Sequence, residues 1–169
     1  YDIYHELENE VKRDFDFIKK LNKEVVNNLQ VKMHPGDGRF FDFQTKLRWQ
    51  DALPHVKVVN PNIKFDKFKD NSKLFIFNYE STGFLQLINI NFPTLLILRD
   101  FEIQKKDNYK KYYDSLLNSK ILHLTNESLV NHLDDIKDNI ETWWNSSKTQ
   151  NDLKNFIKLF ANNENSTPE

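Results

Sequence analysis

Between residues 4 and 29, apolar side chains recur every three or four positions. These positions are Val11, Phe15, Ile18, Leu21 and Val25. This period is typical of an amphipathic helix that buries one face. The pattern therefore predicts one long helix over residues 4–29.

Short runs of strand-forming residues follow at five places. They cover residues 29–34, 56–59, 73–78, 94–98 and 121–124. Turn-forming residues stand beside several of these runs, as Pro35, Pro61 and Pro93 do, which is typical of strand ends. The apolar run at 73–78 suits a strand that is covered on both faces. We expect five short strands.

Helical patterns separate these runs. The predicted helices cover residues 41–52, 65–69, 81–90, 109–117, 126 to about 144 and 153–160, with Ser81 and Asn126 as N-caps. Strands that alternate with helices favour a parallel sheet, because parallel neighbours need crossover connections. The fold class is therefore α/β, a Rossmann-like parallel sheet of about five strands with helices on both faces.

The chain has 169 residues, no internal repeat and no long linker, which favours a single domain over residues 1–162 and a polar tail over 163–169. Its net charge is -1, which gives no electrostatic case for binding nucleic acid. Cysteine is absent, which excludes disulfides, thiol catalysis and Cys-based zinc sites and favours the cytoplasm. No apolar run approaches the roughly 20 residues of a membrane span. Because the first residue is Tyr1 and not Met, we expect a piece of a longer polypeptide.

The segment KMHPGDGR holds two of the three glycines and follows the first predicted strand. Ligands of open parallel sheets bind at the carboxyl ends of strands, where His34 stands. Gly36 and Gly38 would let backbone N–H groups approach an anion. Lys32 and Arg39 supply positive charge beside them. The segment is typical of a phosphate pocket.

A second segment with the same position is NYESTGFLQ, at residues 78–86. Ser81 and Thr82 begin a helix whose first N–H groups point at any anion placed there, and Gly83 leaves that end accessible. Gln86 lies four residues after Thr82, on the same helix face, where it could reach a sugar hydroxyl. Glu80 flanks this predicted phosphate site.

Each of these features also has a purely structural interpretation. Ser81 could serve only as a cap, and the HPGDG turn could serve only to connect a strand to a helix. Loop carboxylates such as Asp37 and Glu80 are usually solvated, so neither is assigned as a general base. His55, His123 and His132 lack the spacing of metal ligands, and we interpret them as surface or core residues. We interpret Trp143 and Trp144 as residues that pack the C-terminal helices.

Four stretches together resemble a known family. They are HPGDG, NYESTGFLQLININ followed by Pro93, YYDSLLNSKILH, and HLDDIKDNIETWWNSSKTQNDLKNF. Over residues 31–160 they resemble the bacterial transferases of O-antigen and surface-carbohydrate biosynthesis. That family looks like the C-terminal, donor-binding half of a GT-B glycosyltransferase. The motifs are also similar to those of sialyltransferases and Kdo transferases that use CMP-sugars, and of CDP-glycerol glycerophosphotransferases.

The resemblance implies a function for several of these residues. His34, Ser81 and Thr82 would contact the donor phosphate, with His34 as the catalytic group, while Gln86 occupies a position where an acidic residue is more usual. The donor site would also include Lys32, Gly36, Gly38, Arg39, Glu80 and Gly83. Transfer would need neither a metal ion nor a cofactor.

The implied protein is the donor-nucleotide-binding domain of a surface-polysaccharide glycosyltransferase, with a CMP-activated acidic sugar as donor. Its partners would be the nucleotide-sugar donor, a glycan or lipid-linked acceptor and an N-terminal GT-B domain outside this chain. It would work in the cytoplasm, either free or peripherally bound to the inner face of the membrane. Two alternatives stay open: a CDP-polyol phosphotransferase and a non-catalytic interaction module.

Overall fold

The structure is a computed structural model that describes residues 3–33, 45–59, 63, 65–99 and 110–163. The chain divides into two compact units, Tyr1–Ser72 and Lys73–Glu169. Both contain parallel strands and helices, so the α/β prediction is confirmed. The described strands form two sheets, of two and of three strands, where the sequence predicts one sheet of about five.

The first unit is built around two short parallel strands. Its elements are α1 (Ile3–Lys20), α2 (Lys23–Asn27), β1 (Gln30–Lys32), α3 (Thr45–Ala52), β2 (Lys57–Val59) and α4 (Phe65–Lys69). Val31 of β1 pairs with Val58 of β2. Phe15 of α1 packs edge-to-face on Trp49 of α3, with ring centroids 4.9 Å apart, so these two helices share a small aromatic core.

The prediction of one helix over residues 4–29 is wrong at one point. The side chain of Asn22 accepts a hydrogen bond from the backbone N–H of Glu24 at 2.9 Å and caps α2. A side chain that satisfies the backbone in this way competes with helix continuation, so α1 ends at Lys20.

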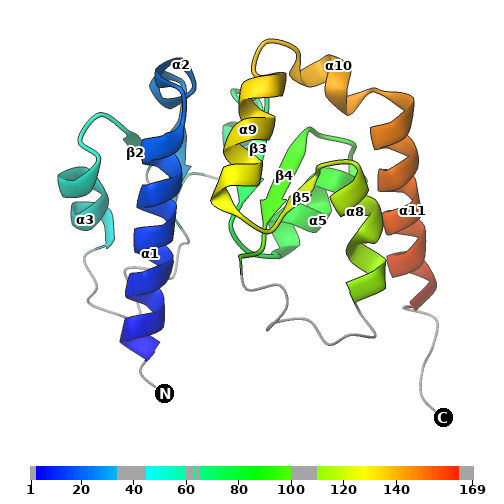
Figure 1. Cartoon of the computed structure of the whole chain (residues 1–169), viewed down its shortest axis with the longest axis horizontal. Helices are drawn as coiled ribbons and strands as arrows, with labels where there is room; N and C mark the ends of the chain where they lie inside the picture. Colours follow the sequence, from blue (N-terminus) through cyan, green and yellow to red (C-terminus); the bar gives the residue numbers. More distant parts are fainter. Residues whose placement is uncertain (1–2, 34–44, 60–62, 64, 100–109, 164–169) are drawn as a thin grey trace. The chain divides into compact units, whose positions relative to one another are not determined.

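The second unit contains the three-stranded sheet (Figure 1). Its elements are β3 (Phe75–Phe77), α5 (Thr82–Asn89), β4 (Thr94–Ile97), the 3-10 helix η1 (Lys111–Tyr113), α8 (Asp114–Asn118), β5 (Leu122–His123), α9 (Asn126–Ile136), α10 (Ile140–Trp144) and α11 (Ser147–Asn163). The strand order is β3-β4-β5, and both pairings are parallel. Every residue of the central strand β4 is buried, as a strand covered on both faces requires.

Alternate residues of β4 face opposite sides of this sheet. Leu96 and Leu98 belong to an apolar cluster that α5, α8, α10 and α11 complete. The cluster consists of Phe84, Ile88, Leu96, Leu98, Tyr113, Leu116, Ile121, Leu122, Trp144, Leu153 and Phe156. His123, the neighbour of Leu122 in β5, faces the other side and meets His132 of α9. Helices therefore cover both faces of this sheet.

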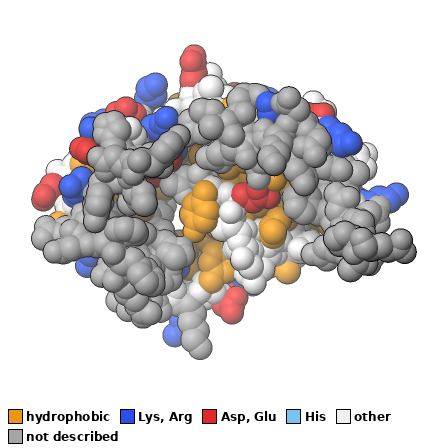
Figure 2. Space-filling model, turned by 90° about the horizontal axis from the view of Figure 1, so that it is seen from below, with side chains coloured by type: hydrophobic (Ala, Val, Ile, Leu, Met, Phe, Trp, Pro, Cys, Tyr) orange, Lys and Arg blue, Asp and Glu red, His pale blue; other side chains and the backbone are white. Residues whose placement is uncertain are grey.

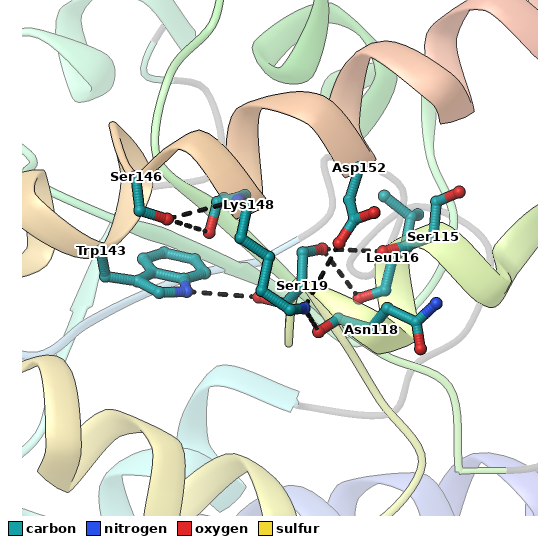
Figure 3. A network of polar contacts seen from close by, with 9 residues as sticks. Ser115, Leu116, Asn118, Ser119, Trp143, Ser146, Lys148 and Asp152 are labelled. Carbon is teal, nitrogen blue, oxygen red and sulfur yellow. Dashed lines mark hydrogen bonds and ion pairs between the residues drawn. The ribbon is translucent and has the colours of Figure 1, made fainter.

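Polar contacts join the C-terminal helices to the end of α8 (Figure 3). Ser119 donates its hydroxyl to the carbonyl of Ser115 at 3.0 Å, and its own carbonyl accepts from Trp143 Nε1 at 3.3 Å. Lys148 of α11 donates to the carbonyl of Asn118. Trp144 is only 2% exposed. The interpretation of the two tryptophans as packing residues is confirmed.

Trp144 also explains an unusual backbone conformation. Its Nε1 donates to the carbonyl and the side-chain oxygen of Asn91, both at 3.0 Å. Asn91 has φ = 57°, in the left-handed region that Asn tolerates better than most residues. The turn between α5 and β4 is thus fixed by the C-terminal helices. None of the helices in the part of the chain that the structure describes has the length and apolar content of a membrane span.

Candidate functional site

Three polar segments leave the carboxyl edge of the sheet β3-β4-β5. Glu80, Ser81 and Thr82 follow β3, Arg99 follows β4, and Asn126 follows β5. Since the strands are parallel, their carboxyl ends lie at one edge of the sheet. This edge is where ligands of open α/β sheets bind. We take it as the candidate site.

The start of α5 is held by Ser81, as the sequence predicts. Ser81 has an extended backbone, and its Oγ accepts a hydrogen bond from the N–H of Phe84 at 3.2 Å. The first bond within the helix runs from the N–H of Leu85 to the carbonyl of Ser81. The N–H groups of Thr82 and Gly83 precede both of these bonds, so the helix itself does not use them. They are the donors that an anion at this tip would meet.

Thr82 and Gln86 are both exposed, and α5 places them one turn apart on the same side. The predicted pairing of these two side chains on one face agrees with the observed helix. Neither side chain is needed in the apolar cluster, which takes Phe84 and Ile88 from this helix. A bound molecule could therefore contact Thr82 and Gln86 without disturbing the core.

Gly83 has a packing role that the sequence does not reveal. A Cβ atom at this position would lie 3.3 Å from Cε1 of Phe77, closer than ordinary van der Waals contact. The absence of a side chain thus lets the first turn of α5 approach β3. Gly83 serves the close approach of helix and strand as well as any access to the helix tip.

Glu80 is engaged by a distant tyrosine. Both of its carboxylate oxygens accept from the hydroxyl of Tyr113, at 2.8 Å each. Tyr113 is 3% exposed and belongs to the apolar cluster. The contact fixes the segment that leads into α5, so Glu80 helps to position the helix tip.

Arg99 and Asn126 also lie at this edge, and the sequence motifs did not predict them as site residues. Nε of Arg99 donates to Oδ1 of Asn126 at 2.8 Å. The sequence shows only that Arg99 begins a charged stretch. Leu98 still donates its N–H to the carbonyl of His123, so Arg99 is the first residue beyond the sheet hydrogen bonds of the central strand. The position of Arg99 directly after the predicted strand 94–98 is the sequence feature that could have indicated it.

Several predicted site residues belong to the first unit. Lys32 is the last residue of β1 and is half-buried. His34, Gly36, Gly38 and Arg39 lie outside the described residues. The predicted meeting of His34 with the tip of α5 therefore stays a prediction.

The first unit also has a shallow depression of about 390 Å³. Residues of α1 and α3 line it: Glu8, Val11, Lys12, Phe15, Arg48, Asp51 and Ala52. None of these is a predicted site residue. Its charged rim of both signs and its small apolar floor give no indication of a particular ligand.

Two buried imidazoles, one from β5 and one from α9, lie beside each other. His123 and His132 are 2% and 3% exposed, and their ring centroids are 5.3 Å apart. Nε2 of His123 lies 2.9 Å from the carbonyl of Lys120, which can only accept, so this nitrogen carries the proton. Nδ1 then accepts from the hydroxyl of Ser128 at 2.8 Å. Of the two interpretations that the sequence left open, surface or core, the structure shows the core for both.

Burial keeps both of these imidazoles neutral. Desolvation lowers the pKa of His123 from 6.5 to about 4, against the opposing effect of its hydrogen bond to Lys120. Desolvation and the neighbouring His123 lower the pKa of His132 to about 4. Among the described residues, neither ring nitrogen of His132 has a hydrogen-bond partner, and no group of three His, Asp or Glu side chains is placed to hold a metal ion.

In the face that Figure 2 shows, Lys and Arg side chains are interspersed with Asp and Glu side chains, in keeping with the net charge of -1. The net charge of -1 provides no overall attraction for an anionic ligand. Binding at the candidate site would depend on local donors such as the tip of α5.

A family model described as LIC12162 family transferase matches residues 3–169. No curated protein and no solved structure matches the chain. The match extends over both compact units and over all the predicted site residues.

Proposed function

The chain belongs to the LIC12162 family of transferases, and from that premise we propose that it binds the nucleotide part of a sugar donor for a surface-polysaccharide glycosyltransferase. The donor is a CMP-activated acidic sugar. The fold would be the C-terminal half of a GT-B enzyme, and an N-terminal domain outside this chain would bind the glycan or lipid-linked acceptor. Its place would be the cytoplasm or the inner face of the membrane.

One observation carries most of this proposal. The helix α5 begins at the carboxyl end of a strand in a parallel sheet, with Ser81 as its cap and no acidic residue in its first turn. The tip of such a helix attracts a phosphate through its N–H groups and its dipole. Exposed Thr82 and Gln86 stand where they could contact the phosphate and the adjoining sugar.

The chemistry that we propose is transfer with a nucleotide phosphate as leaving group. Negative charge grows on that phosphate as the glycosidic bond breaks. Donors that are fixed in advance stabilise this charge most strongly in the transition state. We propose that His34 and the tip of α5 are the donors. The step requires no group from the chain to be oxidised or reduced.

Binding of cytidine nucleotides tests the proposal directly. We expect CMP, titrated to millimolar concentration, to shift the amide signals of residues 81–86 in ¹H–¹⁵N spectra of the full 169-residue chain. His34→Ala should abolish the shifts, whereas His55→Ala, at an exposed histidine, should leave them unchanged. Spectra that do not change with CMP would overturn the proposal.

A parallel titration with CDP-glycerol separates the two candidate donors. Tighter binding of CDP-glycerol than of a CMP-sugar would favour the hypothesis of a CDP-polyol phosphotransferase. Such an enzyme would bind its donor at the same edge of the sheet. Binding of neither nucleotide would favour the non-catalytic interaction module.

A further inference from the structure

Arg99 occupies the middle of the candidate site. It follows β4, the strand that has β3 on one side and β5 on the other. Side chains that leave the central strand of a three-stranded sheet can reach ligands held by either neighbour. Arg99 is, among the residues that the structure describes, the first cation that follows this central strand.

The strand register makes this position explicit. The pairing of β3 with β4 ends at Phe77 and Leu96, and Glu80 and Arg99 each lie three residues beyond it. The pairing of β4 with β5 ends at Ile97 and His123, and Arg99 and Thr125, the cap of α9, each lie two residues beyond it. Arg99 thus leaves the sheet between the segments that enter α5 and α9.

The guanidinium group is also oriented. Its Nε donates to Oδ1 of Asn126, the first residue of α9, at 2.8 Å. A bond at Nε fixes the plane of the group and the direction of its two Nη atoms, because the guanidinium is rigid and planar. Both Nη atoms are shielded from bulk solvent. A charge in such surroundings interacts with an anion more strongly than an exposed charge does.

A guanidinium keeps its positive charge at all working pH values and matches the geometry of phosphate oxygens. A lysine ammonium is a point charge on a flexible stem and does not offer this planar match. Arg99 would add a permanent positive charge to a helix tip that carries only a partial one.

We propose that Arg99 binds a phosphate oxygen of the nucleotide donor and that Asn126 is the residue that positions it. This inference rests on the proposed function, since it names a further residue of the same donor site. Arg99 contributes to the affinity for the phosphate, while the base and the ribose are recognised elsewhere.

The test compares CMP with cytidine, which lacks the phosphate, by calorimetry or spectral titration of the full chain. For Arg99→Gln we expect CMP to bind at least tenfold more weakly and cytidine to bind as it does to the wild type. The CMP affinity of Arg99→Lys should lie between that of the wild type and that of Arg99→Gln. Asn126→Ala should weaken CMP binding about threefold without affecting cytidine binding. Arg48→Gln, which removes an exposed arginine of α3, is the matched control and should change neither.

The outcomes separate this inference from the proposed function. If the wild type binds CMP and Arg99→Gln binds it equally well, the role of Arg99 is overturned and the donor site stands. If the wild type binds no CMP, both are overturned. If Arg99→Gln does not fold, Arg99→Lys and Asn126→Ala decide: an unchanged ratio of CMP to cytidine affinity in both would refute the inference.

Discussion

Two helices of the second unit, α5 and α9, begin at the same edge of the sheet with nearly the same cap. Ser81 (φ -129°, ψ 162°) accepts from the N–H of Phe84 at 3.2 Å, and Thr125 (φ -135°, ψ 151°) accepts from the N–H of Ser128 at 3.1 Å. By cap geometry alone, the two helix tips would be equally good anion sites. A cap is therefore insufficient to identify a ligand site.

The residues after each cap distinguish the two tips. The first turn of α9 contains Glu127, whose carboxylate already complements the helix dipole. The first turn of α5 contains no acidic residue. In addition, Ser128 of α9 is bonded to the buried His123, whereas the first turn of α5 opens with exposed Thr82. The tip of α9 is completed by its own chain, and that of α5 is suited to an external anion.

The largest expected effect concerns acid, because α9 packs on two buried imidazoles. The pKa of His123 and of His132 is about 4 in the folded chain and 6.5 in the unfolded chain. Below pH 6.5 the unfolded chain therefore binds protons that the folded chain excludes. The free energy of unfolding should fall from pH 6.5 to pH 4, by on the order of 3 kcal/mol for the coupled pair of histidines. Urea unfolding at several pH values measures this.

A pair of variants isolates the histidine contribution. His132→Phe should reduce the loss of stability between pH 6.5 and pH 4, and His55→Phe, at an exposed position, should not. Hydrogen exchange at pH 5 should show that amides of α9 lose more protection than those of α5. If the free energy of unfolding depends on pH equally in His132→Phe and His55→Phe, the buried imidazole does not make α9 acid-sensitive.

The second effect concerns charge at the tip of α5. Thr82→Glu gives α5 the carboxylate that α9 has at Glu127, and we expect it to weaken CMP binding at least tenfold by repelling the phosphate. The fold should be retained, because an acidic residue in the first turn stabilises a helix. Glu127→Gln is the complementary variant, for which the CMP affinity should stay within twofold. A Thr82→Glu chain that binds CMP normally would show that the tip of α5 is not the phosphate site.

The features of this edge that could be predicted from the sequence are those that depend on neighbouring residues in the chain. A serine before an apolar helical pattern predicts a cap, and Ser81 is one. The five strands were found because strand formers and turn residues are also local signals. The cap of α9 is Thr125 and not the predicted Asn126. The prediction of one helix from Asn126 to about residue 144 is wrong, because α9 ends at Ile136 and α10 begins at Ile140.

Contacts between distant residues were missed for a physical reason. Tyr113 and Glu80 are 33 positions apart, and Arg99 and Asn126 are 27 apart. Such pairs depend on how the strands are ordered, which periodicity does not encode. The division of the strands into two sheets was missed in the same way, because alternating strands and helices describe one sheet or two equally well.

The smallest expected effect compares the two caps directly. Ser81→Ala and Thr125→Ala each remove one side-chain acceptor from a helix start, and each should lower the free energy of unfolding by about 1 kcal/mol. Only Ser81→Ala should also weaken CMP binding, because its hydroxyl lies at the proposed phosphate site while that of Thr125 lies beside Glu127. Urea unfolding and CMP titration of both variants measure the two quantities. Equal losses of CMP affinity would mean that both caps act only through stability, and the distinction between the two tips would then rest on charge alone.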